Sequence, residues 1–238
     1  MAMRNILRGD DPTLVKKSRV VTDYNKRLHI LLDDMRETLL EANGLGLAAP
    51  QVGVLRRAVL VVDLSIDAED PEEQIVELVN PEIVACSGEQ NGSEGCLSVP
   101  GVYGMVTRPE HIKVRARDRW GDGFELVCSD LTARAVCHEV DHLNGVIFTT
   151  LTDHFLTEEE LEQMRLEKEA EAEALVAAEE ELAAAEEELA AVEEELAAVA
   201  ERLAATQEAL AATQEALAAT QEALAAEAAQ AAEEATDK

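Results

Sequence analysis

The last third of this chain contains no glycine, proline, cysteine or tryptophan after Phe155, and most of its apolar residues are alanines. A segment of this kind lacks the large side chains that fill a core at ordinary packing density. Residues 157–238 hold 25 Asp and Glu against 4 Lys and Arg, so they carry most of the formal net charge of −30. We therefore expect a folded domain over residues 1–156, followed by an acidic Ala/Glu-rich tail over 157–238.

Long apolar runs are also missing. No segment approaches the roughly 20 apolar residues of a membrane span, and the first five residues lack the apolar core of a secretory signal. The strong negative charge disfavours nucleic acid and anionic membranes as direct partners. We expect a cytoplasmic protein, in which a reducing environment favours free thiols or metal ligands over disulfides among the four cysteines.

Two segments of the first domain have helical periodicity. Apolar residues spaced by three and four predict a helix over 23–42, which Asn43-Gly44 would end. A second helix is predicted over 131–143, with Ser129 or Asp130 as its N-terminal cap and Asn144-Gly145 as its end.

Strand patterns lie between these helices. The short β-branched run at 57–64 predicts a buried strand, and 111–118 with 124–128 predicts a hairpin around a Gly-Asp-Gly turn. Residues 76–84 contain Asn80-Pro81 and predict an irregular sheet edge. Because the helices and strands are segregated along the chain, α+β is the predicted fold class.

The tail has a seven-residue period. Thr157 with Glu160 is typical of a capping box, leucine recurs every seven residues from Leu175 to Leu224, and ATQEALA occurs three times from Ala205. The positions three residues after these leucines include Ala185, Val192, Val199, Thr206, Thr213 and Thr220, small side chains that would bury little in a second apolar row. Three interpretations remain open: a coiled coil or other helical pairing, a lone solvated helix, and a largely disordered chain.

The strongest chemical signal is His138-Glu139-Val140-Asp141-His142. A spacing of four puts both imidazoles on one helix face, where they can bind one metal ion, and the glutamate between them can exchange a proton with water at that ion. The alternative interpretation is two histidines that match the pattern by chance.

A hydrolytic metal site needs a third protein ligand. The metzincin spacing would require a histidine at the position of Phe148, which disfavours that class of protease. A gluzincin-like protease would use a downstream carboxylate, which the many glutamates of the tail leave open. An upstream alternative is Cys96 in Glu94-Gly95-Cys96-Leu97-Ser98, although a lone cysteine is more often a small buried hydrophobe.

Three segments together, GLGLAAPQ at 44–51, EGCLS at 94–98 and HEVDH at 138–142, resemble the signatures of peptide deformylases. The resemblance covers roughly residues 1–155 and leaves the tail outside it. It implies the α+β deformylase fold and an enzyme that removes the N-terminal formyl group from formyl-methionine of newly synthesised proteins. The expected partners are N-formyl-methionyl nascent peptides, with transient ribosome association, while the tail would self-associate or bind a helical partner.

The resemblance also implies a role for each matching residue. Cys96, His138 and His142 would bind one divalent metal, Glu139 would be the general acid and base, and Gln51 would stabilise the oxyanion. The backbone N–H of Leu97 would share that last role. Gly46 would bind the substrate backbone, and Arg108 would pair with Glu94 to brace the cysteine loop. Asp141 would orient a histidine or stabilise the loop.

The family implies Fe²⁺ as the metal, with Zn²⁺, Ni²⁺ or Co²⁺ able to substitute, and a Cys/His/His set suits zinc equally well. Cys137 departs from the glutamine that is frequent just before the first histidine of this family. We expect it to pack as a small hydrophobe, although it could compete for the metal or oxidise with Cys96. Cys86 and Cys128 are expected to be core residues.

Overall fold

The computed structural model describes residues 2–68 and 70–236. The chain divides into two compact units, the first ending at Leu161 and the second beginning at Glu162. Within the described residues, no helix combines the length and the apolar composition that crossing a membrane would demand.

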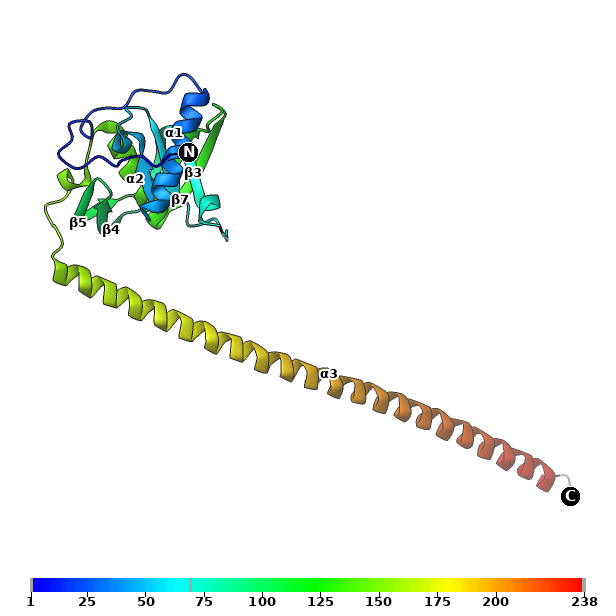
Figure 1. Cartoon of the computed structure of the whole chain (residues 1–238). Helices are drawn as coiled ribbons and strands as arrows, with labels where there is room; N and C mark the ends of the chain where they lie inside the picture. The colour runs from blue at the N-terminus through cyan, green and yellow to red at the C-terminus, as the bar shows by residue number, and fades with distance from the viewer. Residues whose placement is uncertain (1, 69, 237–238) are drawn as a thin grey trace. The chain divides into compact units, whose positions relative to one another are not determined.

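The first unit contains two antiparallel sheets and two helices (Figure 1). The larger sheet has the order β1-β2-β3-β6-β7, formed by Gly46–Ala48, Ala58–Val62, Ile75–Ser87, His111–Arg117 and Gly123–Ser129. The smaller pairs β4 (Gln90–Cys96) with β5 (Val99–Arg108). The helices are α1 (Lys26–Glu41) and α2 (Asp130–Asn144), with short 3-10 turns at Ala49–Val52, Pro71–Gln74 and Phe148–Thr150. The predicted α+β class and the predicted hairpin are confirmed.

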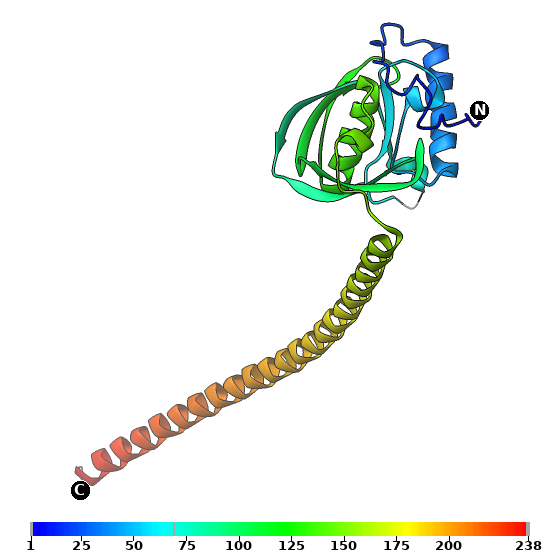
Figure 2. The same ribbon diagram turned by 90° about the vertical axis from the view of Figure 1, so that its left-hand side faces the viewer.

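Strand β2 is buried on both faces. Ala58 and Leu60 pack in the cluster that contains the apolar face of α1, while Val59 and Val61 pack in the cluster that contains α2. Figure 2 shows the two helices on opposite sides of this sheet. Successive side chains of a strand point to opposite faces, so a strand covered by a helix on each side must be apolar throughout. This arrangement explains the continuous apolar run in its sequence.

The irregularity predicted at 76–84 is confirmed, but its predicted place at a sheet edge is wrong, because β3 is the central strand of the large sheet. The ladder to β6 shifts register between Val79 and Glu82, and Asn80 has a positive φ of 53°. The Asn80 side chain accepts from the backbone N–H of Val21 and donates to its carbonyl. Pro81 therefore lies in a bulge, where its missing N–H does not interrupt the sheet.

Both helices of the first unit begin and end near their predicted residues. The Asn25 side chain accepts from the N–H groups of Arg27 and Leu28, which starts α1. Gly145 ends α2 in the left-handed conformation, as predicted. Ser129 is the N-cap residue of α2, as predicted, but its hydroxyl donates to the neighbouring Asp130 carboxylate and makes no cap hydrogen bond to the helix.

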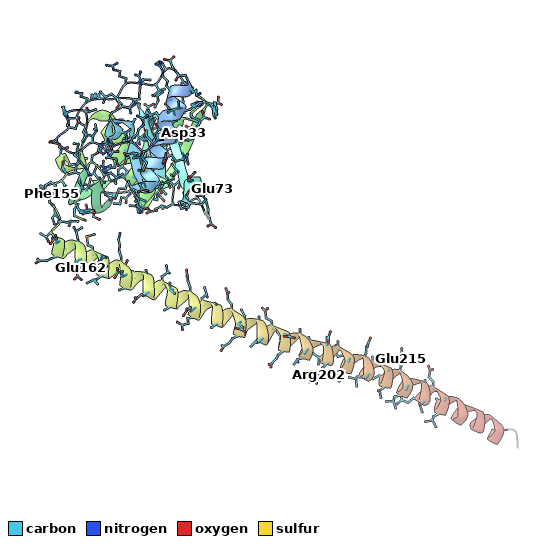
Figure 3. All side chains as sticks on the ribbon, viewed as in Figure 1. Asp33, Glu73, Phe155, Glu162, Arg202 and Glu215 are labelled. Carbon is cyan, nitrogen blue, oxygen red and sulfur yellow. The ribbon has the colours of Figure 1, made fainter. Side chains whose placement is uncertain are left out.

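The second unit belongs to one helix, α3, which spans Glu158–Thr236. The predicted capping box is confirmed, because the Thr157 N–H donates to Glu160 Oε2 and the Glu160 N–H donates to Thr157 Oγ1. At 79 residues, the helix is roughly 120 Å long. Figure 3 shows side chains of α3 pointing away from the ribbon in the part of the helix where they are drawn, with Glu162, Arg202 and Glu215 labelled.

All four cysteines are free thiols. Cys128 and Cys137 are buried, as predicted, and burial raises the pKa of each thiol to about 11. The prediction of a core position for Cys86 is wrong, because this residue is exposed. It lies in the part of β3 that extends past the pairing with β2, where burial decreases.

Candidate active site

Helix α2 and the end of β4 bring a thiol and two imidazoles together. His138 and His142 lie one turn apart on the buried face of α2, and the Cys96 Sγ lies 3.2 Å from His142 Nε2. The three donor atoms all lie within 4.8 Å of one another, and among the described residues this is the one group of three such side chains able to hold a metal ion. Within the first unit, the side chain that joins the two histidines is therefore the upstream thiol of Cys96.

A bulge in the small sheet places the cysteine. The β4–β5 register shifts between Gly95 and Cys96, at the end of β4. A Cβ on Gly95 would lie 2.6 Å from a ring atom of Tyr103, so a side chain at this position would displace that ring. The glycine before Cys96 is thus required by the close approach of Tyr103.

Glu94 orients one of the histidines. Its Oε2 accepts a hydrogen bond from His138 Nδ1 at 3.0 Å, which leaves Nε2 of that ring free for an ion. Arg108 donates to both carboxylate oxygens of Glu94, at 2.8 and 3.0 Å. Burial by itself would raise the pKa of Glu94, but the hydrogen bonds from Arg108 and His138 outweigh it and hold the pKa at about 2. The carboxylate therefore stays ionised.

A second arginine, Arg134, was not recognised in the sequence. It is buried one helical turn before His138, and its Nη1 donates to Glu94 Oε1 at 3.0 Å. The same guanidinium donates to the backbone carbonyls of Val106 at 2.8 Å and Gln90 at 3.1 Å. Arg134 thereby ties α2 to both strands of the small sheet. The available signal was its spacing of four from His138, which puts a charged side chain on the buried helix face.

Asp141 belongs to the same network. Its Oδ2 accepts from Arg108 Nη1 at 2.6 Å, and no hydrogen bond joins it to a histidine among the described residues. Of the two roles considered for this residue, the geometry fits stabilisation of the loop through Arg108.

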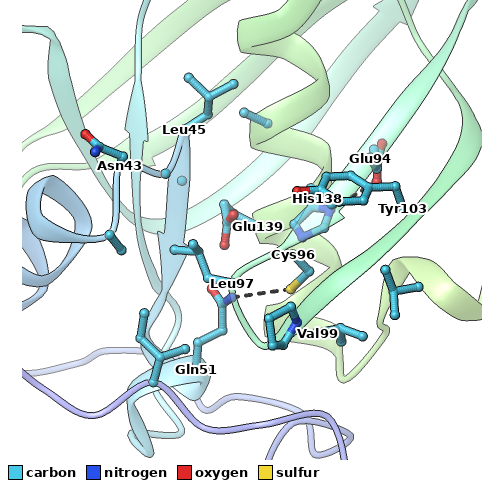
Figure 4. A pocket seen from close by; sticks show the side chains of 18 of the residues that line it. Asn43, Leu45, Gln51, Glu94, Cys96, Leu97, Val99, Tyr103, His138 and Glu139 are labelled. Carbon is cyan, nitrogen blue, oxygen red and sulfur yellow. Dashed lines mark hydrogen bonds and ion pairs between the residues drawn. The ribbon is translucent and has the colours of Figure 1, made fainter. Parts of the chain in front are cut away.

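Gln51 points its amide group at the cysteine. The side chain is 1% exposed, its Oε1 accepts from the Ala48 N–H at 2.7 Å, and its Nε2 lies 3.6 Å from Cys96 Sγ. Figure 4 shows this contact as a dashed line, with Glu139 and His138 above it in this view. Ser98, also missed in the sequence, accepts from the same Nε2 at 3.4 Å. Leu97 lines the pocket beside them.

Glu139 is buried without a partner for one of its oxygens. The residue is 3% exposed, and nothing among the described residues hydrogen-bonds to its Oε2. Burial raises its pKa to about 7. Gly46 faces it so closely that a Cβ there would lie 2.6 Å from Glu139 Oε1. Because Gly46 has no side chain, the Glu139 carboxylate can lie against its backbone.

The donor set fits a divalent cation. Burial, together with the charge of His138, lowers the pKa of His142 to about 3, so this imidazole is neutral, as a ligand must be. Burial would also lower the pKa of His138, but hydrogen bonds to Cys96 and Glu94 raise it to about 10. A cation bound between the rings and the sulfur would replace the proton that His138 otherwise keeps. One thiolate and two imidazoles leave a further coordination position for water or substrate.

The site opens into a cleft of about 570 Å³. Its wall includes apolar side chains from three stretches of the chain, namely Leu45, Leu97, Val99, Val102, Leu131 and Ala135. A mostly apolar cleft that ends at a few convergent polar groups is the usual form of a small-substrate site.

These features define the class of protein as a metal-dependent hydrolase, because a ligand set of one thiolate and two imidazoles adjoins a buried carboxylate that can carry a proton. The family model described as polypeptide deformylase matches residues 3–156. The peptide deformylase of Caldicellulosiruptor bescii is 52% identical over 165 residues, which cover 69% of this chain and 95% of that protein. Peptide deformylase 1 of Bacillus subtilis is 48% identical over 164 residues, covering 69% and 99%.

Solved structures agree with this relationship. The crystal structure of a peptide deformylase from Legionella pneumophila has a TM-score of 0.59 at 38% identity and covers 73% of this chain and 98% of its own. The Thermotoga maritima peptide deformylase gives a TM-score of 0.59 at 32% identity, covering 64% and 99%. This chain belongs to the polypeptide deformylase family, whose members are metalloenzymes that remove N-formyl groups from nascent peptides.

Proposed function

We propose that Cys96, His138 and His142 hold the divalent cation with which this chain hydrolyses the formyl amide of N-formyl-methionyl peptides. The observation that supports this proposal is the convergence of their three donor atoms beside Glu139, whose buried Oε2 has no hydrogen-bond partner among the described residues. We propose Fe²⁺ as the ion in the cell, with Zn²⁺, Ni²⁺ and Co²⁺ able to replace it, since this ligand set accepts all of them. When bound, such an ion acidifies water and polarises a carbonyl oxygen.

Glu139 is the proposed general base and acid. Its carboxylate accepts a proton from the attacking water and passes it to the departing amine, so that formate and a free N-terminus are released. Burial favours this role because it brings the pKa of the carboxyl to about 7, near the working pH.

Gln51 and Leu97 are the proposed oxyanion donors. The bond from Ala48 to Gln51 Oε1 fixes the amide so that its NH₂ group faces Cys96. A donor fixed before the reaction needs no rearrangement when charge develops on the formyl oxygen, and it therefore stabilises the transition state efficiently. The backbone N–H of Leu97, next to the cysteine, would supply the second hydrogen bond.

Substrate recognition is assigned to Gly46 and the cleft. The methionine side chain would occupy the apolar wall that includes Leu131 and Ala135, and the peptide backbone would align with the backbone of Gly46. Glu94 and Arg108 would act through His138, which they keep in the orientation for metal binding.

We assign catalysis to residues 1–156 and an accessory, interacting role to the tail at 157–238, which would pair with another helix. Substrates of this kind emerge from ribosomes, so we place the enzyme in the cytoplasm with transient ribosome association. The four free thiols are compatible with that reducing compartment.

The test is formate release from a formyl-Met-Ala-Ser peptide by protein loaded anaerobically with Fe²⁺. We expect formate release that a chelator abolishes. The Cys96→Ala variant should release no formate and should no longer bind metal stoichiometrically. An iron-loaded protein that leaves the peptide formylated would refute the proposed function. Internal cleavage of an unformylated peptide that survives Cys96→Ala would instead identify a gluzincin-like protease.

A further inference from the structure

Helix α3 carries a row of exposed leucines. They recur every seven residues from Leu175 to Leu224, and each of the eight side chains is between 60% and 68% exposed. Single exposed leucines are ordinary on protein surfaces, but a continuous apolar row along a helix marks an interaction surface. The row therefore needs a partner, and the residues beside it indicate which partner fits.

The leucines and the residues three positions after them together form the seam along which a second helix would pack. Between residues 196 and 224, the second row of this seam is compatible with burial. Three residues after successive leucines lie Val199, Thr206, Thr213 and Thr220, which gives the alternating three and four spacing of a coiled coil. Each threonine hydroxyl donates to the carbonyl four residues earlier, at 2.8 Å. Since these hydroxyls are already satisfied inside the helix, covering them leaves no unpaired donor.

The flanks of the seam differ between the two halves of the helix. Between 175 and 195 both flanks are acidic, occupied by Glu179, Glu181, Glu186, Glu188, Glu193 and Glu195. Between 196 and 224 the flanks contain no acidic residue, since they are Ala200, Arg202, Gln207, Ala209, Gln214, Ala216, Gln221 and Ala223. The glutamates of this second half, Glu201, Glu208, Glu215 and Glu222, lie five residues after each leucine, on the opposite side of the helix.

We propose that residues 196–224 form a two-stranded coiled coil with the same residues of a second copy of this chain. Flanking charges set partner choice in coiled coils, and here a second copy meets no like charge beside its leucines. A basic helix would find its complementary glutamates along 175–195 but not along 196–224. Along residues 175–195, two copies would bring Glu against Glu on both flanks. This first half of the helix therefore stays outside the pairing. This inference rests on the proposed interacting role of the tail and is independent of the chemistry at Cys96.

The first experiment measures the mass of the full-length protein by sedimentation equilibrium. We expect a dimer for the unaltered chain and a monomer for Leu210→Glu with Leu217→Glu. The matched control is Ala211→Glu with Ala218→Glu, which adds the same two charges next to the seam in sequence but away from it on the helix surface. The control should remain dimeric. A monomeric unaltered chain, or the same mass for both variants, would overturn the proposal.

The second experiment strengthens the seam instead of breaking it. Replacing Thr206, Thr213 and Thr220 by valine exchanges three hydroxyls per copy for methyl groups at positions that favour β-branched apolar residues, and should lower the dimer dissociation constant at least about ten-fold. No tightening would count against the proposed seam.

Salt dependence separates the two kinds of partner. Self-association of so acidic a tail should tighten as salt rises, because the repulsion between two copies is screened, whereas binding of a basic helix would weaken. Dimers that dissociate as salt rises would contradict the proposal. Formate release measured on the same samples reports the proposed function separately, since it should be equal in all variants.

Discussion

Arg134 and His138, one turn apart on the buried face of α2, hydrogen-bond to different oxygens of the same carboxylate. Glu94 Oε1 accepts from Arg134 Nη1 and Glu94 Oε2 accepts from His138 Nδ1, each at 3.0 Å. Because Arg134 also holds Val106 and Gln90 of the small sheet, one guanidinium links the helix that carries both histidines to the hairpin that carries Cys96. The spacing between thiol and imidazoles thus depends on this link.

Arg134→Lys should weaken metal binding by about 10- to 100-fold, the usual effect of losing an outer hydrogen-bond partner of a metal ligand. Lysine keeps the charge but lacks the planar fork that reaches several acceptors at once. The measurement is chelator competition for Co²⁺, with the visible spectrum of the bound ion as a report on its geometry. Arg115→Lys, at an exposed position of β6, is the matched control and should leave affinity and spectrum unchanged.

Glu139→Gln should lower kcat by about 10²- to 10⁴-fold, the contribution of a positioned general acid and base. The change keeps the shape of the side chain in its buried position, so metal content should remain stoichiometric. Formate release and metal analysis on one preparation check this expectation. Activity close to that of the unaltered protein would exclude Glu139 as the proton carrier.

Gln51→Leu should raise the barrier to formyl hydrolysis by about 2–4 kcal/mol, the cost of losing one oxyanion donor. Gln51→Glu makes a useful companion, because it retains an acceptor for the Ala48 N–H while losing the donor that faces Cys96. Both variants should bind metal normally and fall in kcat/KM. If Gln51→Glu retained full kcat/KM, the amide would have only a structural role.

Gly46→Ala should lower kcat/KM by about 100-fold, the scale of a small misplacement of a catalytic group. The new Cβ would lie 2.6 Å from Glu139 Oε1 and force that carboxylate out of position. Gly123→Ala is the matched control, since a Cβ at that position in β7 meets nothing within 4 Å. Thermal unfolding of both variants would show whether the loss at Gly46 is confined to the site.

Removing the tail after Leu161 should leave kcat/KM near that of the full chain, because the first unit has its own core. The cut must keep residues 154–156, since the Met105 N–H donates to the His154 carbonyl and the Leu156 N–H donates to the Tyr103 carbonyl, along β5. A strong loss of activity in the shortened chain would show that the tail takes part in the chemistry.

The sequence by itself determined the fold class, the two long helices of the first domain, the hairpin and the capping box of α3. These features depend on local spacing and on turn residues such as Gly145, which a linear pattern records directly. It also supplied the three deformylase-like segments, because the residues of each lie side by side along the chain.

Only the tertiary structure decided which residues distant in sequence meet. The central position of β3 depends on a bulge at Asn80 held by the backbone of Val21, and the exposure of Cys86 depends on where the neighbouring strand ends. The buried contacts among Arg134, Glu94 and Arg108 join three elements at once, so no local pattern encodes them. Hydrogen bonds over long sequence separations form only when packing has fixed both partners. The surroundings of the metal ligands are therefore a property of the tertiary structure.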